Sequence, residues 1–557
     1  MRKNLILTLS ACSLVLMTSC SKLGKLSADN FSVTPNPLET VGGKVPATVE
    51  GQFPEKFMNK KATVTVVPEL RYGNGQVVKG QAVTFQGEKV MANHKVISYR
   101  LGGRYTMKTV FDYVPAMQKS DMYLAFDARI GNSKVNVPAI KVATGVIATA
   151  ELYRKAMQQG GACLALDSFQ RVIDHKQEAN VKFLINQANL RSNELKNNSV
   201  CEFVSMLKRI NADREKLAIK NVEVQAYASP EGGFTFNDKL ANKRQNVSEG
   251  YVKQQLKGTN LQTDIDAHYT AQDWEGFMKL VQASKIQDKD VILRVLSMYK
   301  DPQEREQQIR NMSEGFRELA DGILPELRRS RLIINYQTIG RSDQQIKQQY
   351  AADPTKLSLE ELLYAASLTN DVKAKKAIYK KTTELYDRDY RAYNNLAALA
   401  LNEGDEHTAN SYLSQALQAN RKAPEAYANK AYINLTHGEI AEAEHNLADA
   451  TEANGFNEII GNLHIARGNY ANATDELFND NNSAALAQLL NKNYVAAEQT
   501  LKAIKQPNGL TYYLFAVLNA RQGKNDTAAK YLKEALQKDP SLAEYAKNDL
   551  ELAKVNK

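Results

Sequence analysis

The chain has little cysteine, tryptophan and histidine for its length, with four, one and seven of them among 557 residues. The histidines form no His-x-x-x-His pair and there is no Cys-x-x-Cys, which excludes the common zinc-binding spacings. Neither a Gly-x-Ser-x-Gly elbow nor a phosphate-binding P-loop occurs. The sequence therefore predicts a protein that is not an enzyme and that needs no metal and no cofactor.

Long apolar runs are also scarce, because only Leu5 to Met17 forms one. No later stretch approaches the roughly 18 apolar residues that span a bilayer. The run follows Arg2-Lys3 and ends at Met17-Thr18-Ser19-Cys20, where small residues precede a cysteine. This N-terminus resembles a bacterial lipoprotein leader, which implies that residues 1–19 are removed and that Cys20 carries the lipid. A conventional leader that happens to end at a cysteine is the alternative.

Charge of one sign is not concentrated anywhere in the chain. The formal net charge is +10 and falls by two when the leader is removed. The lysines are scattered, and no basic stripe interleaved with aromatic residues is present, so nucleic acid is not an expected partner. The lipoprotein resemblance implies a short tether at 20–27. Ser21 and the absence of an acidic cluster after it imply an outer-membrane protein that faces the periplasm.

Alternating strand-like runs follow the tether. Residues 28–148 contain β-branched and aromatic stretches at Ala62–Val67, Gln81–Phe85 and Arg104–Tyr113, separated by Gly and Asn. Short strands at this spacing predict a β-sandwich region. The pattern then becomes helical, which predicts a helical connector over 149–174.

The stretch from Asn221 to Leu256 predicts a strand, a loop and a helix in close succession. Its residues 222–227 alternate apolar and polar, and Ser229-Pro230-Glu231-Gly232-Gly233 ends the strand. A helix is expected from about Asn237, with Leu240, Val247 and Tyr251 on one apolar stripe and Arg244 in line with it. A core-facing guanidinium must meet a carboxylate, a carbonyl array or an anionic ligand. The alternative is that Arg244 snorkels to the surface.

These residues also carry a family resemblance. The run Tyr227 to Gly232, followed by Asn237, Leu240 and Arg244, resembles the loop and helix of OmpA-like domains, which anchor outer membranes to peptidoglycan. Val181–Leu195 is similar to the first strand and turn of that family, and Leu327–Tyr336 is similar to its closing strand. The resemblance covers 175–340, with Ala267–Arg317 interpreted as a helical insertion.

The resemblance implies a peptidoglycan site made by Arg244, Asn237, Ser229 and Glu231. In the family an arginine and an aspartate hold the diaminopimelate end of the stem peptide. Arg244 matches the arginine, but Ser229 stands where the aspartate is expected. Because Ser229 brings no charge to meet an ammonium group, affinity for that group would fall or would depend on Glu231 instead.

Outside the leader and the anchor, the only cysteines are Cys163 and Cys201. An oxidising periplasm permits a disulfide between them. Spacing alone does not decide between that bridge and two buried free thiols. Ser199 to Glu202 forms a capping-box pattern, which predicts a helix with Phe203, Leu207 and Ile210 on one face.

After a polar linker at 341–356, the segment 357–557 repeats with a period of 34 residues. The pairs that show it include Tyr393 and Tyr427, Asn395 and Asn429, and Gly404 and Gly438. This period resembles the tetratricopeptide repeat, which implies helix pairs stacked into a superhelix with a concave groove. The resemblance implies that Asn394, Asn395 and Asn429 reach a protein or peptide partner bound there. Local capping or pairing of these asparagines is the alternative.

The predicted fold class is multidomain, with an N-terminal β-sandwich, an α/β OmpA-like domain carrying a helical insertion, and a C-terminal all-α tetratricopeptide superhelix. The predicted function is a lipid-anchored scaffold that contacts peptidoglycan and recruits a protein partner. A second hypothesis is an interaction subunit of an envelope secretion or fimbrial assembly that does not bind peptidoglycan. A hydrolase of cell-wall sugars is disfavoured, because no pair of pocket carboxylates can be identified.

Overall fold

Two separately packed units make up the computed structural model, which describes residues 23–287, 289–311 and 317–555. Unit 1 runs to Asp167 and resumes at Thr369, and unit 2 is the continuous stretch Ser168–Leu368. The chain therefore leaves unit 1 once and returns to it after unit 2 is complete. The predicted leader and Cys20 lie outside the described residues.

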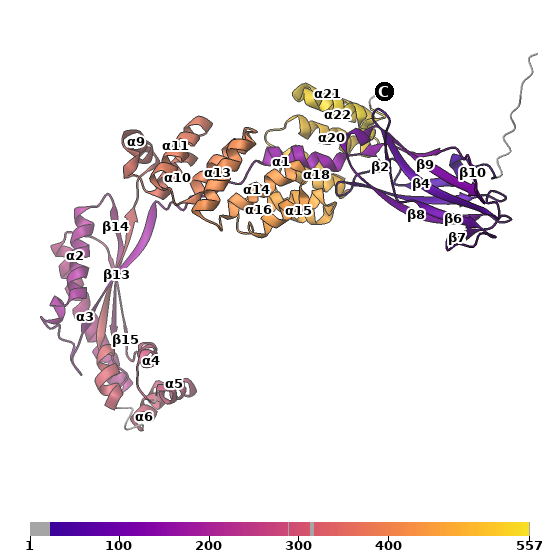
Figure 1. Cartoon of the computed structure of the whole chain (residues 1–557). Helices are drawn as coiled ribbons and strands as arrows, with labels where there is room; N and C mark the ends of the chain where they lie inside the picture. The colour runs from indigo at the N-terminus through magenta and orange to yellow at the C-terminus, as the bar shows by residue number, and fades with distance from the viewer. Residues whose placement is uncertain (1–22, 288, 312–316, 556–557) are drawn as a thin grey trace, which may run out of the picture. The chain divides into compact units, whose positions relative to one another are not determined.

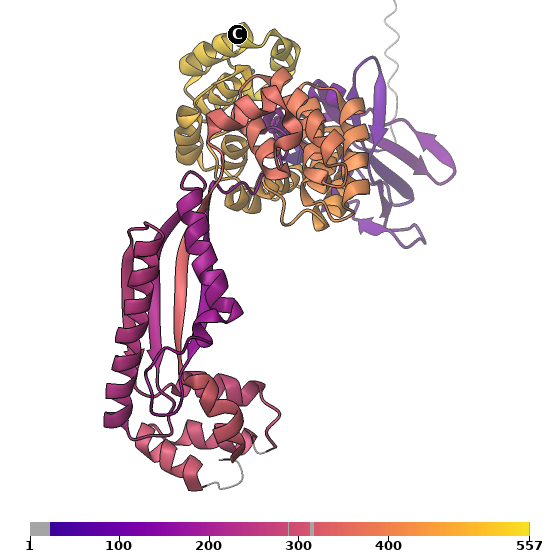
Figure 2. The same cartoon turned by 90° about the vertical axis from the view of Figure 1, so that its left-hand side faces the viewer.

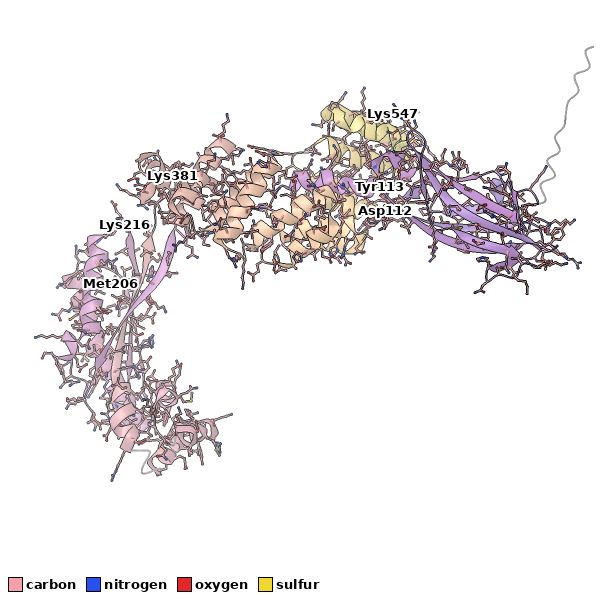
Figure 3. The ribbon with its side chains drawn as sticks, in the orientation of Figure 1. Asp112, Tyr113, Met206, Lys216, Lys381 and Lys547 are labelled. Atoms are coloured by element: carbon pink, nitrogen blue, oxygen red, sulfur yellow. The ribbon has the colours of Figure 1, made fainter. Side chains whose placement is uncertain are left out.

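Two sheets that share one apolar core form the N-terminal part of unit 1, as the sequence predicted. The first has the order β1-β3-β8, and the second has the order β10-β9-β4-β6-β7, with β5 and β11 paired to β4 and β9. Their bounds are β1 (Phe31–Thr34), β3 (Lys44–Phe53), β4 (Ala62–Tyr72), β5 (Gln76–Lys79), β6 (Val83–Gly87), β7 (Lys95–Ile97), β8 (Gly103–Asp112), β9 (Ser120–Ile130), β10 (Ser133–Val135) and β11 (Ile140–Thr144). Along β8, buried residues alternate with exposed ones up to Asp112, and Tyr113 follows it (Figure 3). Side chains on a strand point to opposite faces, so this alternation fills the core between the sheets.

The connector after the sandwich is only partly helical. A short parallel pair, β2 (Leu38–Glu39) with β12 (Val146–Ile147), leads to η3 (Thr149–Leu152) and α1 (Tyr153–Gly160). The prediction of a helical connector as far as Asp174 is wrong, because the C-cap Gly161 has φ +77° and the helix ends there. Glycine adopts this left-handed conformation without a Cβ clash. Residues 161–170 have neither helical nor strand structure, although they are well packed at several positions.

Helix pairs fill the rest of unit 1, and α1 lies among them (Figure 1). They are α12 (Tyr390–Asn402) with α13 (Glu406–Ala419), α14 (Pro424–His437) with α15 (Ile440–Ala448), α16 (Phe456–Ala466) with α17 (Tyr470–Glu476), α18 (Asn482–Leu490) with α19 (Tyr494–Ala503), and α20 (Gly509–Arg521) with α21 (Asn525–Lys538). In each pair a residue with positive φ turns the chain between the two helices. Four of these are glycines, Gly404, Gly438, Gly468 and Gly523, and the fifth is Lys492. The helix α11 (Val372–Leu385) precedes the pairs, and η7 (Pro540–Leu542), α22 (Ala543–Asn548) and η8 (Leu550–Leu552) follow them.

Unit 2 is built on a four-stranded sheet of order β13-β16-β14-β15, in which only β14 and β15 are parallel. Its elements are β13 (Val172–Lys182), η4 (Glu194–Lys196), α2 (Asn198–Ala212), β14 (Leu217–Tyr227), α3 (Phe234–Gly258), β15 (Asp264–Thr270) and β16 (Arg329–Ile339). The helices α2 and α3 run along the sheet (Figure 2), and the buried apolar residues of α2 share one core with one face of the sheet and with Val252 and Leu256 of α3. Met206 of α2 packs at the margin of this core (Figure 3). The predicted apolar face of α2, Phe203, Leu207 and Ile210, is confirmed.

Three boundaries in unit 2 differ from the prediction. The first strand mostly precedes Val181 instead of starting there, and Asn197 rather than Ser199 caps α2. The predicted insertion starts too early, because residues 267–270 belong to β15, where they pair with β14. A strand that pairs throughout cannot also begin a helical insertion.

The insertion is a small helical layer with its own core. It contains α4 (Trp274–Ala283), α5 (Lys289–Met298), α6 (Pro302–Asn311), the π-helical turn η5 (Leu319–Ile323) and α8 (Leu324–Leu327). Trp274 and Phe277 meet edge to face at 5.7 Å between ring centroids inside this core. The large apolar side chains of the insertion are therefore buried in this core.

The predicted linker at 341–356 contains a helix, α9 (Asp343–Ala352), which a capping box at Ser342 begins. The turn η6 (Pro354–Lys356) and the helix α10 (Leu359–Ser367) complete unit 2. Ile346 of α9 is buried, so this segment is packed into the unit. Among the residues the structure describes, no helix combines the length and the apolar character needed to cross a membrane.

Candidate functional sites

The loop between β14 and α3 is held in shape by its own side chains. Asn237 on the first turns of α3 donates through Nδ2 to the carbonyls of Ser229 at 2.9 Å and Gly232 at 2.8 Å. The Ser229 hydroxyl donates to Glu231 Oε1 at 2.9 Å. The Glu231 carboxylate accepts two bonds from the Arg328 guanidinium, each at 2.9 Å. We call Ser229, Glu231, Asn237 and Arg328 the loop cluster.

The structure thus brings Ser229, Glu231 and Asn237 together, but polar atoms of their side chains already form hydrogen bonds with other groups of the protein. Ser229 and Asn237 are only 3% exposed, so neither presents its side chain to solvent. Arg328, which the sequence placed only in a closing strand, compensates the charge of Glu231 in a two-point contact. A ligand that used Glu231 would have to compete with that contact.

Arg244 faces the core of unit 2, as its position in the sequence pattern suggested. The apolar stripe was wrong in part, because Val247 is 37% exposed whereas Ser248, Val252 and Leu256 are buried. These residues continue the i, i+4 spacing from Arg244, which keeps them on one helical face. The stripe that includes the arginine is therefore the true inner face of α3.

A carbonyl array receives the Arg244 guanidinium, which is 1% exposed as a residue. Its Nε donates to the Gln187 carbonyl at 2.9 Å, and its two terminal nitrogens donate to the carbonyls of Tyr227 at 2.9 Å and Leu184 at 3.2 Å. The ring of Phe183 lies 5.0 Å from the guanidinium carbon. Snorkelling is thereby excluded.

Burial lowers the pKa of Arg244 to about 10, and the nearby charge of Arg328 acts in the same direction. The guanidinium is still protonated at neutral pH. As a charged donor it links α3 to the end of β14 and to the loop after β13. Three of its five N–H groups are committed to backbone carbonyls.

The sequence did not indicate a polar cleft of about 700 Å³ between the uncovered face of the sheet and the start of α4. Four ion pairs line it: Arg331 with Glu178, Arg329 with Asp273, Lys182 with Glu326, and Lys279 with Glu275. Every cation in this group has an acidic partner, so the cleft is close to neutral. The arginine-rich run at Leu327–Tyr336 was the available signal, but its partners come from β13 and the insertion.

The second candidate site lies on two helices of the repeats in unit 1, α12 and α14. Asn394 and Asn395 lie on α12 and Asn429 lies on α14, and all three are buried with at most 2% exposure. Their partner is an extended segment of the same chain, residues 162–167, which we call the connector segment. This contact within the chain was not predicted. The available signal for it was the Gly160-Gly161 pair, at which α1 ends.

The side-chain amides of these asparagines both donate hydrogen bonds to peptide groups of the connector segment and accept hydrogen bonds from them. Asn429 accepts from the Cys163 N–H at 2.7 Å and donates to the Cys163 carbonyl at 2.8 Å. Asn395 does the same for Ala165, at 2.8 and 2.9 Å. Asn394 also donates to the Cys163 carbonyl at 3.0 Å, and its own carbonyl accepts from Asn429 at 2.9 Å. The local pairing of these asparagines therefore occurs, and the segment that they contact belongs to the same chain. Their predicted contact with a separate partner stays a prediction.

The two cysteines are free thiols, so the disulfide that the sequence left open is not formed. Cys201 is exposed on α2, which also contradicts the alternative of two buried thiols. Cys163 is buried in the groove of the repeats, and burial raises the pKa of its thiol to about 12. A thiol in that environment remains protonated and behaves as a small apolar side chain.

Comparison with known proteins finds similarity to solved structures of tetratricopeptide repeat proteins. No family model matches the chain, and no curated protein is similar to it. A tetratricopeptide repeat protein from Parabacteroides merdae is 15% identical over 37% of this chain and 91% of its own, with a TM-score of 0.28. A second one, from Thermus thermophilus, is 16% identical over 38% of this chain and 99% of its own, with a TM-score of 0.18.

Yeast Tom70 is 12% identical over 66% of this chain and 84% of its own, with a TM-score of 0.24. The C-terminal region is an array of tetratricopeptide-like helix pairs. That assignment rests on the helix pairs and on the residue with positive φ between the two helices of each pair. The similarities to solved structures are too low to support it.

Proposed function

We propose that the protein is a non-enzymatic scaffold of the outer membrane, anchored by a lipid on Cys20 and facing the periplasm, which binds a protein partner through its repeats. The observation that carries the proposal is the set of hydrogen bonds by which Asn394, Asn395 and Asn429 hold the connector segment. We call these three residues the asparagine clamp. Side chains from successive helix pairs hold an extended segment through its backbone, which is how a peptide-recognition groove works. The lipid anchor and its orientation are supported by the sequence around Cys20 alone.

Membrane attachment is tested by Cys20→Ser in cells. Wild type is expected in the outer-membrane fraction with incorporated palmitate, and the variant is expected to lose both. The orientation is tested by adding protease to intact cells. Resistance before permeabilisation and degradation after it support a periplasmic protein, whereas degradation on intact cells would contradict the orientation.

Partner binding is tested by photo-crosslinking in cells from positions on the repeats. An adduct with one protein, formed from repeat positions and not from the outer face of the sandwich, is the expected outcome. A chain that forms no protein adduct from any repeat position would refute the scaffold proposal.

Peptidoglycan contact is a second candidate, favoured by the assembly of Ser229, Glu231 and Asn237 beside Arg244. The internal bonds of these residues make it the weaker one. The test is co-sedimentation of the mature protein with purified sacculi, comparing wild type with Glu231→Gln and with Glu202→Gln, an exposed carboxylate on α2. We expect Glu231→Gln to lower the bound fraction at least fivefold and Glu202→Gln to leave it unchanged. Wild type that stays in the supernatant would exclude this candidate.

A further inference from the structure

The repeat groove has the geometry of a strand receptor. Asn395 and Asn429 are equivalent positions of consecutive repeats, and they pair with residues two apart in the connector segment. A primary amide can donate and accept at once, so each asparagine replaces the neighbouring strand of a sheet for one residue of the occupant. One repeat therefore reads two residues of extended backbone, whatever their side chains.

Two further contacts add to the same recognition, one beside the clamped residues and one between them. Asn402 accepts from the Ala162 N–H at 3.1 Å, and Asn454 donates to the Leu164 carbonyl at 3.0 Å. All these contacts are made by side-chain amides to peptide groups. Side-chain amides that form hydrogen bonds with peptide groups therefore follow one another along the groove.

Side-chain size is restricted at two alternate positions of the occupant. Cys163 and Ala165 are 5% and 4% exposed, whereas Leu166 is 63% exposed. Gly455, with φ +92°, lies against the Cys163 thiol, and a Cβ at that glycine would come within 3.0 Å of the sulfur. The groove accordingly accepts small side chains at 163 and 165 and tolerates any side chain at 166.

We propose that this groove is a receptor for an extended peptide of a partner protein that has small side chains at two alternate positions, and that the connector segment occupies it as a built-in competitor. The inference rests on the proposed partner binding and specifies the form of the partner and the condition for its entry. A tethered competitor acts at an effective concentration in the millimolar range. A free peptide with an intrinsic Kd of about 10 μM, equal to that of the segment, should therefore bind the resting protein roughly 100-fold more weakly than an emptied groove.

The test uses the full mature chain and a fluorescein-labelled peptide with the sequence of residues 161–168 carrying Cys163→Ala. Binding is followed by fluorescence anisotropy in wild type and in Ala165→Trp, whose indole cannot fit where Ala165 lies. We expect the variant to bind the peptide at least 100-fold more tightly than wild type. Equal binding by the two proteins would overturn the built-in competitor.

Two further variants show where the peptide binds. In the Ala165→Trp background, Asn395→Ala should abolish binding, and Asn410→Ala, an exposed asparagine on α13, should leave it unchanged. Binding that survives Asn395→Ala would overturn the receptor geometry. Circular dichroism of each variant checks that the repeats remain folded.

Hydrogen exchange on wild type needs no folding-sensitive variant. The amides of Cys163 and Ala165 should exchange slowly, and 1 mM of unlabelled peptide should speed their exchange severalfold by displacing the segment. Unchanged exchange would refute displacement. These measurements need no cellular partner, so failure of the crosslinking experiment and failure of the groove model remain distinguishable.

Discussion

Asp549 is the buried acid on which the C-terminal end of unit 1 depends. It is 2% exposed, it accepts from the Tyr513 hydroxyl at 2.5 Å, and it caps η8 by accepting from the Glu551 N–H at 3.0 Å. Arg521 pairs with Glu551 beside it, and Tyr545 is buried against the same group of side chains. Burial raises the pKa of Asp549 to about 6, and the nearby charge of Glu551 acts in the same direction.

This shift predicts a pH dependence of the stability of unit 1. Because the folded pKa lies above the unfolded value near 3.9, the stabilising term is fully present below pH 4 and is lost as the pH rises through 6. The term amounts to about 3 kcal/mol over that window. Denaturant unfolding at pH 4.5 and 7.5 should show wild type losing this advantage over Asp549→Asn at the higher pH.

Asp526→Asn provides the control for Asp549→Asn, since Asp526 is an exposed carboxylate on α21. Its difference from wild type should not change between the two pH values. If the difference between Asp549→Asn and wild type is likewise independent of pH, the proposed titration is wrong.

At the scale of elements, the inward position of Arg244 on α3 was predictable and its hydrogen-bond partners were not. Periodicity in the sequence placed Arg244 toward the core, because spacing along a helix is local information. The three carbonyls that receive it come from residues 184, 187 and 227, and their convergence depends on how β13, β14 and α3 pack. The connector segment was missed for the same reason, since its partners lie more than 200 residues away.

The repeats illustrate the opposite case, in which the sequence sufficed. A helix pair with a positive-φ turn recurs along this region, with 34 residues between Gly404 and Gly438 and shorter spacings afterwards, so these elements follow from local pattern. The asparagines were predicted to reach a bound partner or to pair locally, and in the structure they contact an extended segment. That the segment belongs to the same chain could only come from the fold.

Arg244→Lys should destabilise unit 2. A lysine keeps the charge but cannot reach three diverging carbonyls, so buried acceptors lose their donors at a cost of about 2–4 kcal/mol. Thermal unfolding should show the loss, and hydrogen exchange should show loosening of the loop at residues 184–187. Lys243→Ala, at the exposed neighbouring position, should behave as wild type. An Arg244→Lys variant as stable as wild type would contradict the role of the carbonyl array.

At the scale of the whole molecule, the two units differ in how they depend on the chain. Unit 2 is continuous and contains its own sheet and helical cores. Unit 1 is discontinuous, because Ala150, Tyr153 and Met157 share one core with the repeat helices. The Tyr153 hydroxyl also donates to the Leu435 carbonyl at 3.1 Å.

The isolated fragment 168–368 should therefore fold on its own, whereas 369–557 alone should be markedly less stable than the same repeats in the full chain. Circular dichroism melting of both fragments checks this. We expect adding residues 149–167 as a separate peptide to raise the melting temperature of the repeat fragment by several degrees. A disordered 168–368 fragment would refute the autonomy of unit 2.

The interrupted path of unit 1 also sets an order of events for a newly made chain. Thr149 donates to Glu551 across 402 positions of sequence, a separation that spans all of unit 2. Contacts this distant form late, because the intervening loop must first be closed at an entropic cost that grows with its length. If unit 2 has already folded, its ends are fixed and the remaining loop is shorter. The folded unit 2 would thus speed the formation of contacts between the two separate parts of unit 1.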